Sequence, residues 1–427
     1  MGNCQFGTLA LHAGQSKEEG QNARGVPVYR TAAYLFKNAE HAANLFGLKE
    51  LGNIYTRLMN PTQAILEERV AALEGGAAAL AVASGTSAIF YSIINIASAG
   101  EEIVASSHLY GGTYTMFKDI LPQFGITTRF VQPNDFDALD AAINDKTRAV
   151  YGETIGNPGL TVLDIEKTAA VAHKHKLPLI IDSTFTTPYL LRPIEYGADI
   201  VVHSLTKWMG GHGSGVGGIA VDSGKFDWTD PKFKLFNEPD ASYHGLRYAH
   251  DLGDLNPVAF AMRMRLVPLR NLGAAIAPDN AWMFLQGIET LHLRMERHSS
   301  NALKVAQFLE KHPKVEWIHY PGLPSDEGYG LAKKYLPKGQ GGMVVFGIKG
   351  GAAAGEKFVN SVKLHSHVAN VGDAKSLIIH PASTTHSQLD EKAQIEAGVA
   401  PELVRLSVGI EDVEDIINDL ELGFSSI

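Results

Sequence analysis

Short apolar runs recur along the first half of the chain, separated by segments long enough to form helices. The runs are Ile103–Ala105, Ala149–Tyr151, Leu179–Ile181, Ile200–Val202 and Ile219–Val221. Strands of a parallel sheet are covered by helices on both faces, so they lack the polar alternation of a half-exposed strand. The pattern predicts an α/β fold with a mostly parallel central sheet.

The chain before these runs predicts an arm followed by a helix. Residues 1–58 have mixed polarity without a long periodic run, and we expect an arm with one short helix packed on a larger body. Asn60 is a good helix cap, Pro61 suits the first helical position, and Gly75 ends the apolar periodicity. A helix is therefore predicted between Pro61 and Gly75.

The second half of the chain predicts an irregular segment and then a smaller α+β domain. Residues 223–280 show little periodicity, whereas an amphipathic helix is predicted from Leu291 to Leu309. Strand-like segments follow at Val315–His319, Gly342–Ile348, Ser376–Ile379 and Val404–Val408, before a terminal acidic helix. We expect an arm at 1–58, a large domain at 59–290 and a small domain at 291–427.

Composition and charge remove several classes of function. The chain has 46 acidic and 37 basic residues and no long run of like charge, so nucleic acid is not an expected partner. No apolar stretch approaches the roughly 18 residues of a membrane helix. Cys4 is the single cysteine, and the amino terminus lacks the pattern of a signal peptide, which indicates a cytoplasmic protein.

A lysine and an aspartate follow two of the predicted strands. Asp182 ends the run Leu179–Ile181, and Lys207 lies just past Ile200–Val202, so both fall at the carboxyl edge where α/β sheets bind ligands. A lysine there suits a Schiff base with an aldehyde cofactor such as pyridoxal 5′-phosphate (PLP). A carboxylate beside the pyridine nitrogen keeps that nitrogen protonated. The alternative is that Asp182 caps a turn and Lys207 is a surface residue.

A second stretch, Ser84-Gly85-Thr86, lies between an apolar run and a predicted helix. Gly85 lets the backbone approach a ligand, and the first amides of the helix then point at an anion. This arrangement predicts a cradle for the cofactor phosphate. The alternative is an ordinary helix cap by Ser84.

Glycines and histidines elsewhere mimic other sites. Gly213, Gly215 and Gly218 match G-x-G-x-x-G, but a strand is predicted directly after them where a dinucleotide site needs a helix. Histidines that could be paired as metal ligands are His203 with His212 and His380 with His386. None has metal-ligand spacing with carboxylates, so we expect ordinary hydrogen-bonded histidines and no metal.

At this point the sequence resembles a known family, the Cys/Met-metabolism PLP-dependent enzymes, and within it the O-acetylhomoserine sulfhydrylases. The matching segments are 55–62, 110–113, 153–158, 182–189, 203–213, 370–377, 380–386 and 405–411, which follow one another in order over almost the whole chain. The resemblance implies the aspartate-aminotransferase-like fold (fold type I).

The resemblance assigns cofactor contacts. It implies that Lys207 forms the Schiff base, that Asp182 pairs with the pyridinium nitrogen, that Tyr110 stacks on the ring and that Asn157 lies near the ring hydroxyl. Phosphate contacts are implied for Gly85, Thr86, Ser204 and Thr206, with Tyr55 and Arg57 reaching the same phosphate from a neighbouring subunit.

The resemblance also implies how substrate binds. Arg405, helped by Ser376, would clamp the α-carboxylate, which a planar guanidinium does with two hydrogen bonds. Where the family usually has Gln or Met and then Ala after Ser84-Gly85, this chain has Thr86-Ser87. A backbone cradle tolerates that change.

The implied reaction is γ-replacement on O-acetyl-L-homoserine by a sulfur nucleophile, giving homocysteine and acetate in methionine biosynthesis. The alternatives within the family are cystathionine γ-synthase and γ-lyase activity; the segments 223–280 and 370–389 favour the sulfhydrylase. Alternatives of other classes are a silent binding protein and a nucleotide-dependent oxidoreductase. The sequence leaves open acetyl or succinyl as the leaving group, and sulfide, methanethiol or a sulfur-carrier protein as donor. A shared site implies a homodimer or a homotetramer.

Overall fold

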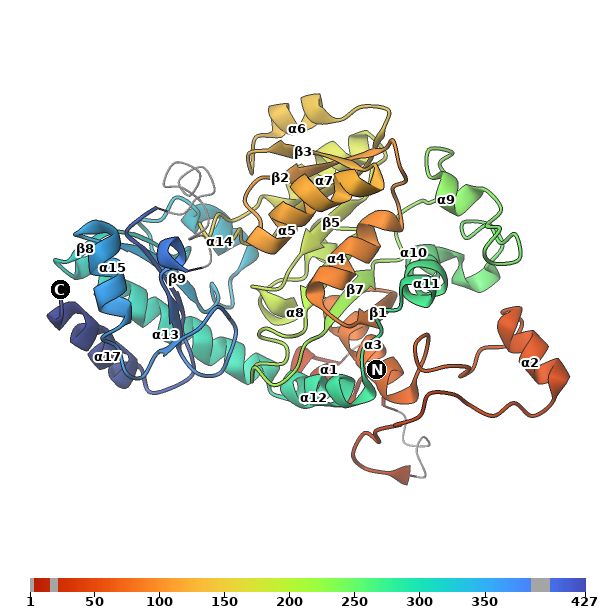
Figure 1. The fold of residues 1–427 in the computed structure, drawn as a ribbon, viewed down its shortest axis with the longest axis horizontal. Helices are drawn as coiled ribbons and strands as arrows, with labels where there is room; N and C mark the ends of the chain where they lie inside the picture. Colours follow the sequence, from red (N-terminus) through yellow and green to blue (C-terminus); the bar gives the residue numbers. More distant parts are fainter. Residues whose placement is uncertain (1–3, 16–21, 385–399) are drawn as a thin grey trace.

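The larger of two β-sheets forms the centre of the chain (Figure 1). A computed structural model describes residues 4–15, 22–384 and 400–427. The larger sheet has the order β1-β7-β6-β5-β4-β2-β3. Its strands are β1 Ala78–Val82, β2 Glu102–Ser106, β3 Thr127–Val131, β4 Thr147–Glu153, β5 Leu179–Asp182, β6 Ile200–Ser204 and β7 Gly218–Asp222. All strand pairs are parallel except those of β7 with β1 and β6, which confirms the predicted α/β fold.

All five predicted runs form strands, and two further strands were not predicted. β1 is a run of small residues that does not stand out as a strand from composition alone. β3 lies at the edge of the sheet and is only partly buried, so its sequence carries polar residues. β3 thus lacks the continuous apolar character of a strand buried on both faces, whereas β1 is apolar but consists mainly of alanine, which has a low strand propensity.

Helices cover both faces of the larger sheet (Figure 1). They include α3 Pro61–Glu74, α4 Gly85–Ile94, α5 Gly111–Thr115, α6 Phe136–Ala142, α7 Ile165–Lys174 and α8 Thr187–Leu190, with π and 3-10 turns at Met116–Ile120, Leu121–Phe124 and Pro193–Tyr196. α3 begins and ends as predicted. The Asn60 side chain accepts the Thr62 N–H, and Gly75 takes the left-handed conformation after the last turn.

The arm contains two helices, so the expectation of one short helix is wrong. α1 Phe6–His12 packs against α3, and α2 Ala39–Phe46 projects beyond the body of the molecule (Figure 1). Asn38 caps α2 by accepting the His41 N–H at 2.8 Å. α1 is only seven residues long, too short to show helical periodicity.

Residues 223–280 are more regular than expected. They contain α9 Lys234–Asn237, then consecutive helical segments η5 Gly253–Val258, α10 Ala259–Met264, η6 Arg265–Leu269 and α11 Arg270–Leu272, and the start of α12 Pro278–Glu289. Pro257 and Pro268 lie inside these segments and conceal the helix in the sequence. Trp228 stacks on Phe236 with ring centroids 4.3 Å apart, so this part has an aromatic core.

The smaller sheet has the order β10-β11-β12-β9-β8. Its strands are β8 Val315–His319, β9 Met343–Ile348, β10 Ser366–His367, β11 Leu377–Ile379 and β12 Leu403–Ser407, and its helices are α13 Leu291–Lys311, α14 Tyr329–Tyr335, α15 Gly351–Val359 and α17 Val413–Ser425, with a 3-10 turn at Pro381–Ser383. The predicted strands and helices of this region are confirmed. The boundaries of the predicted domains at 58 and 290 stay a prediction.

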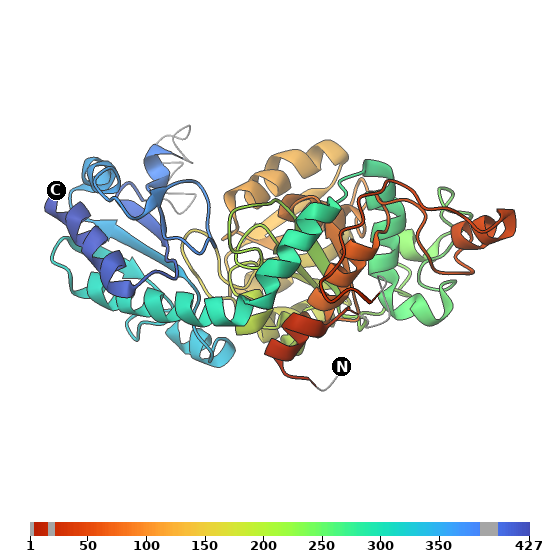
Figure 2. The same ribbon diagram turned by 90° about the horizontal axis from the view of Figure 1, so that it is seen from below.

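Helix α13 runs from the larger sheet into the smaller one (Figure 2). Near its start, the buried Arg294 donates to the carbonyl oxygens of Trp208 and Gly287, each at 2.7 Å, and to Met209 O at 3.3 Å. Two turns later, Asn301 Nδ2 donates to the carbonyls of Gly409 and Glu411 at 3.0 and 2.8 Å. The helix therefore fixes the turn after Lys207 and the chain after β12. None of the helices in the described part of the chain is both long and apolar enough to span a membrane.

Arg294→Met should destabilise the protein. The substitution leaves buried carbonyl oxygens without donors, which we expect to cost about 3 kcal/mol of unfolding free energy. Guanidinium denaturation measures the loss. Arg297→Met is the matched control, because Arg297 lies on the same helix in an exposed pair with Asp412, and its loss should cost below ~1 kcal/mol. Equal losses in the two variants would contradict this role for Arg294.

Candidate active site

Lys207 and Asp182 lie at the carboxyl edge of the larger sheet, on neighbouring elements. Asp182 is the last residue of β5 and pairs in register with Val202 of β6. Lys207 follows the end of β6 by three residues, in a turn whose Lys207 N–H donates to Ser204 O at 3.2 Å. The parallel pairing of β5 and β6 thus brings the predicted acid and amine to one edge.

The Lys207 amine is half-buried and hydrogen-bonded to the smaller sheet region. Its Nζ donates to Asn370 Oδ1 at 2.6 Å. Burial lowers the pKa of Lys207 to about 8, and the nearby Arg405 guanidinium lowers it in the same direction. A substantial share of this amine is therefore neutral near pH 8, as a nucleophile or general base requires.

Arg405 on β12 faces the same place. Its Nη1 donates to Asn157 Oδ1 at 3.1 Å, and burial lowers its pKa to about 10. That is the only hydrogen bond of the guanidinium within the described residues, so its other N–H groups remain for an anion. Arg405 belongs to the smaller sheet, whereas Asn157 lies in the loop after β4 of the larger sheet. Lys207 lies close enough to Arg405 for the pKa of Lys207 to respond.

The amino end of α4 has the features of a phosphate cradle. Ser84 caps the helix, since its Oγ accepts the Ser87 N–H at 3.0 Å. The amides of Gly85 and Thr86 have no hydrogen bond within the described residues. A Cβ at Gly85 would lie 2.7 Å from Ser204 Cβ, so only glycine fits against Ser204. Capping by Ser84 is therefore compatible with a phosphate at the same helix end, and the cradle stays a prediction.

Asp182 and Tyr110 have free surface toward this space. The Thr184 N–H donates to Asp182 Oδ1 at 2.9 Å, and burial raises the pKa of Asp182, opposed by the bonds from Thr184 and by His203. Tyr110 is 53% exposed at the start of α5. Its ring lies over Gly112, where a Cβ would be 2.6 Å from Tyr110 Cε1. The aromatic face is thus available for stacking.

Some predicted residues have other contacts. Ser376 Oγ donates to Glu411 Oε2 at 2.9 Å and accepts the Gly409 N–H at 2.9 Å, so the geometry does not support the expected contact of Ser376 with substrate. Thr206 Oγ1 accepts the Gly217 N–H at 3.1 Å and donates to Gly217 O at 3.3 Å, so it would have to release that carbonyl to donate to a phosphate.

Tyr55 and Arg57 lie on the arm and are both exposed. The Arg57 guanidinium carbon lies 5.3 Å from the centre of the Tyr55 ring. No hydrogen bond within the described residues joins either side chain to Lys207, Arg405 or Asp182. Their predicted contact with a phosphate stays a prediction that needs a second chain.

The histidines and glycines behave as local structure. His203 Nε2 pairs with Glu74 Oε1 at 2.5 Å in the core, and His380 bonds Ser383 and the Pro401 carbonyl. His386 lies outside the described residues, as does the end of the 370–389 segment. Within the described ranges, no group of three or more His, Cys, Asp or Glu is arranged to hold a metal. Gly218 begins β7, so the glycine run opens a strand as expected.

Asn370 is the site residue to which sequence reasoning gave no role. It was visible as the first residue of the segment 370–377, but nothing in the sequence indicates that an amide from that loop reaches Lys207.

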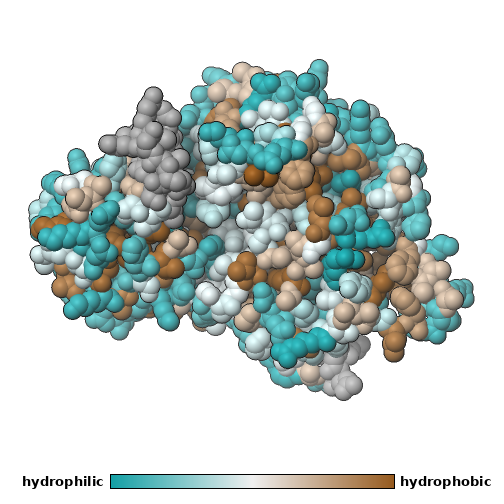
Figure 3. All heavy atoms as spheres, in the orientation of Figure 1, coloured by the Kyte–Doolittle hydropathy of each residue, from teal (hydrophilic) through white to brown (hydrophobic). Residues whose placement is uncertain are grey.

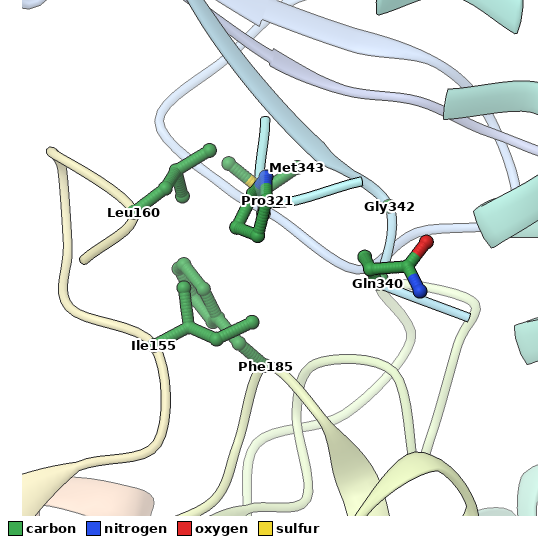
Figure 4. Close-up of a pocket in the computed structure, with 8 residues that line it drawn as sticks. Ile155, Leu160, Phe185, Pro321, Gln340, Gly342 and Met343 are labelled. Carbon is green, nitrogen blue, oxygen red and sulfur yellow. The ribbon is translucent and has the colours of Figure 1, made fainter. Parts of the chain in front are cut away.

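Figure 4 shows a shallow recess between the loop after β4 and the loops before β9, too small to hold a ligand. Ile155, Leu160 and Phe185 point toward Pro321 and Met343 there. The recess has no ionisable lining residue and offers packing rather than chemistry.

Comparisons with known proteins agree with this geometry. The family model described as Cys/Met metabolism PLP-dependent enzyme matches residues 7–425. An O-acetyl-L-homoserine sulfhydrylase of Leptospira meyeri is 56% identical over 98% of this chain and 96% of its own length. A homocysteine synthase of Schizosaccharomyces pombe is 52% identical over 97% of this chain and 96% of its own.

A solved structure is also similar. A Campylobacter jejuni protein described as an O-acetylhomoserine (thiol)-lyase superposes with a TM-score of 0.95 at 43% identity, covering 99% of this chain and 100% of that one. In it, one lysine is present as N′-pyridoxyl-lysine-5′-monophosphate.

In protein freed of any bound group, Lys207 should react with acetic anhydride with a midpoint near pH 8. Arg405→Met should move that midpoint upward, because removal of a neighbouring cation favours the protonated amine. Mass spectrometry of the labelled Lys207 peptide against pH measures both midpoints. Identical midpoints in the two proteins would show that Arg405 does not act on this amine.

Proposed function

The chain belongs to the Cys/Met metabolism PLP-dependent enzymes, and we propose that it replaces the acetate of O-acetyl-L-homoserine with a sulfur nucleophile to give homocysteine. The observation that supports this proposal most strongly is the pair of Lys207 and Arg405 at the sheet edge beside Asp182. Lys207 supplies an amine whose pKa is lowered, and Arg405 supplies a guanidinium. An amine and a carboxylate-binding group so close together suit an α-amino acid. O-acetyl-L-homoserine as the substrate is supported by relatives named for that activity, which are 56% and 52% identical over nearly the whole chain.

The cofactor is PLP, and the residues present fit it. Free amides at Gly85 and Thr86 suit its phosphate, and the Asp182 carboxyl suits its ring nitrogen. We propose that Ser204 and Thr206 add hydroxyl contacts, that Tyr110 covers the ring and that Asn157 lies near the ring hydroxyl. Bound PLP supplies an electron sink for bonds at the substrate Cα.

The side chains then divide the work on the substrate. Arg405 binds the α-carboxylate and fixes the orientation of Cα. The Lys207 amine takes the proton from Cα and moves protons at Cβ, so that acetate can leave from Cγ and sulfur can add there. Asn370 accepts a hydrogen bond from Lys207 and holds the amine between these transfers.

The arm supports an assembly of at least two chains. Leu35 is 99% exposed and Leu51 69% exposed, and further exposed apolar residues on the arm are Phe36, Phe46 and Tyr55. Figure 3 shows apolar surface over α2 at the right-hand end of the molecule. Such a surface favours burial against a second copy. We propose a homodimer, or a tetramer of two dimers, in which Tyr55 and Arg57 reach the phosphate of the partner's site.

The remaining assignments are also proposals. The division into an arm at 1–58, a large domain at 59–290 and a small domain at 291–427 is supported by the two separate sheets. A cytoplasmic location suits a chain with one cysteine and a reduced sulfur substrate. Sulfide, methanethiol and a sulfur-carrier protein are the donors to compare.

Lys207→Ala should abolish both turnover and the visible absorbance of the bound cofactor. The variant has no amine to hold PLP covalently or to move protons. Homocysteine formation from O-acetylhomoserine and sulfide measures turnover, with O-succinylhomoserine, methionine and cystathionine as competing substrates. Lys118→Ala, which removes an exposed lysine, is the matched control. A yellow, active Lys207→Ala protein would refute the assignment.

Mixed oligomers should recover activity if sites are shared. Arg57→Ala and Lys207→Ala chains, dissociated and reassembled together, should regain about one quarter of wild-type sites, since half of random dimers contain one intact site. The same sulfhydrylation assay measures the recovery. No recovery in samples shown to contain both chains would place Arg57 in its own chain's site or outside any site.

A further inference from the structure

Glu153 is an acid beside the candidate site for which the mechanism has no use so far. It is the last residue of β4 and is 8% exposed. Its Oε1 accepts the Tyr110 N–H at 2.7 Å. We propose that Glu153 is a positioning residue that holds the main chain of Tyr110 and thereby the ring that covers PLP. The inference rests on the proposed function only in taking Tyr110 as the stacking residue.

The position of the Tyr110 ring depends on its main chain. The Tyr110 carbonyl accepts the N–H groups of Thr113 and Tyr114 at 2.8 and 2.9 Å, in the first turn of α5. Glu153 holds the other side of the residue through the N–H. The side chain itself is about half exposed and lies over Gly112, so few contacts of its own fix it. Loss of the Glu153 acceptor would leave the Tyr110 N–H without this hydrogen bond and allow the main chain of Tyr110 to move.

Glu153 also neighbours the acid that faces the ring nitrogen. Glu153 and Asp182 pair in register on the parallel strands β4 and β5, so their side chains leave the sheet on the same face. Asp182 must be ionised to keep the ring nitrogen protonated. A second charge next to it would be repelled, and a protonated Glu153 avoids that repulsion while its carbonyl oxygen still accepts the Tyr110 N–H.

The surroundings of Glu153 favour the protonated form. Burial, and then the charge of Asp182, raise the pKa of Glu153 well above its usual range, and the bond from Tyr110 opposes them only in part. The other titratable group that interacts with it is Tyr151 on its own strand, whose pKa burial also raises. Burial raises the pKa of Asp182 as well, opposed by the bonds from Thr184 and by His203. In the proposed arrangement the protonated ring nitrogen of bound PLP keeps Asp182 ionised, and Glu153 carries the proton.

Three variants test the proposal through PLP affinity and the visible circular dichroism of the bound cofactor. Glu153→Ala removes the acceptor and should weaken PLP binding about tenfold and change the dichroism. Glu153→Gln keeps an oxygen acceptor and should recover affinity to within about threefold of wild type. Glu153→Asp, one methylene shorter, should resemble the alanine variant and replaces it if that protein does not fold.

The pH dependence and a control variant separate positioning from general destabilisation. Affinity of the wild type should fall more than that of Glu153→Gln toward alkaline pH, because only the wild type has a proton to lose beside Asp182. Asp199→Ala removes another buried carboxyl that accepts a backbone N–H, from Leu179 at 2.8 Å, at the opposite edge of the sheet. It should lower stability but leave PLP affinity and dichroism near wild type.

The coupling to Tyr110 is measured by a double-mutant cycle. Glu153→Ala should cost little further PLP affinity once Tyr110→Ala is present, since both changes remove the same ring contact. Additive losses, or a glutamine variant as weak as alanine, would overturn the proposal. These measurements use PLP alone, so a wrong amino-acid substrate would leave them unaffected, whereas a wild type that fails to bind PLP would refute the proposed function itself.

Discussion

The hydrogen bond between Lys207 and Asn370 joins the two halves of the site. Lys207 follows a strand of the larger sheet, and Asn370 belongs to the loop after β10 of the smaller sheet. Arg405 and Asn157 make a second bond between the same halves. Burial and the nearby guanidinium lower the pKa of the Lys207 amine to about 8, and that property exists only while both halves hold their positions.

Two acids at the carboxyl edge of the larger sheet differ in their surroundings rather than in residue type. Asp182 and Glu153 are chemically alike and lie on adjacent strands. Asp182 keeps some contact with the open site, whereas Glu153 is enclosed and already bonded to a main-chain N–H. Burial raises the pKa of both acids, so the proposed charge on Asp182 depends on the ring nitrogen of bound PLP.

The sequence predicted most elements that have a continuous apolar run or a clear helical period, and it did not predict elements whose pattern is interrupted by polar residues or proline. Five strands buried on both faces were predicted from their apolar runs, and the helices at Pro61 and Leu291 were predicted from capping residues and periodicity. The buried strand β1, which consists mainly of alanine, was not. The edge strand β3 and the proline-containing helices near Pro257 and Pro268 were missed, because polar residues and proline conceal their periods.

The site shows the same division. Lys207 and Asp182 could be found because strand ends are visible in a sequence, and most other contacts came from resemblance to a family. Asn370 and Glu153 could not be assigned, since their roles depend on which loop faces which strand. The Ser376 hydroxyl bonds Glu411 and Gly409 inside the smaller sheet region, which the sequence did not indicate, and its help to Arg405 stays a prediction.

Helix α13 fixes the distance between the segments that carry Lys207 and Arg405. Arg294 is hydrogen-bonded to the turn after Lys207, and Asn301 is hydrogen-bonded to the chain that follows Arg405. The two residues are seven positions apart on the helix, which is about 10 Å of rise. A helix does not stretch, so the span from amine to guanidinium is set by residue count. Variation in the length of this protein should therefore accumulate in loops and in the arm, while one residue added or lost between positions 294 and 301 would displace Arg405 relative to Lys207 and weaken the binding of any α-amino acid.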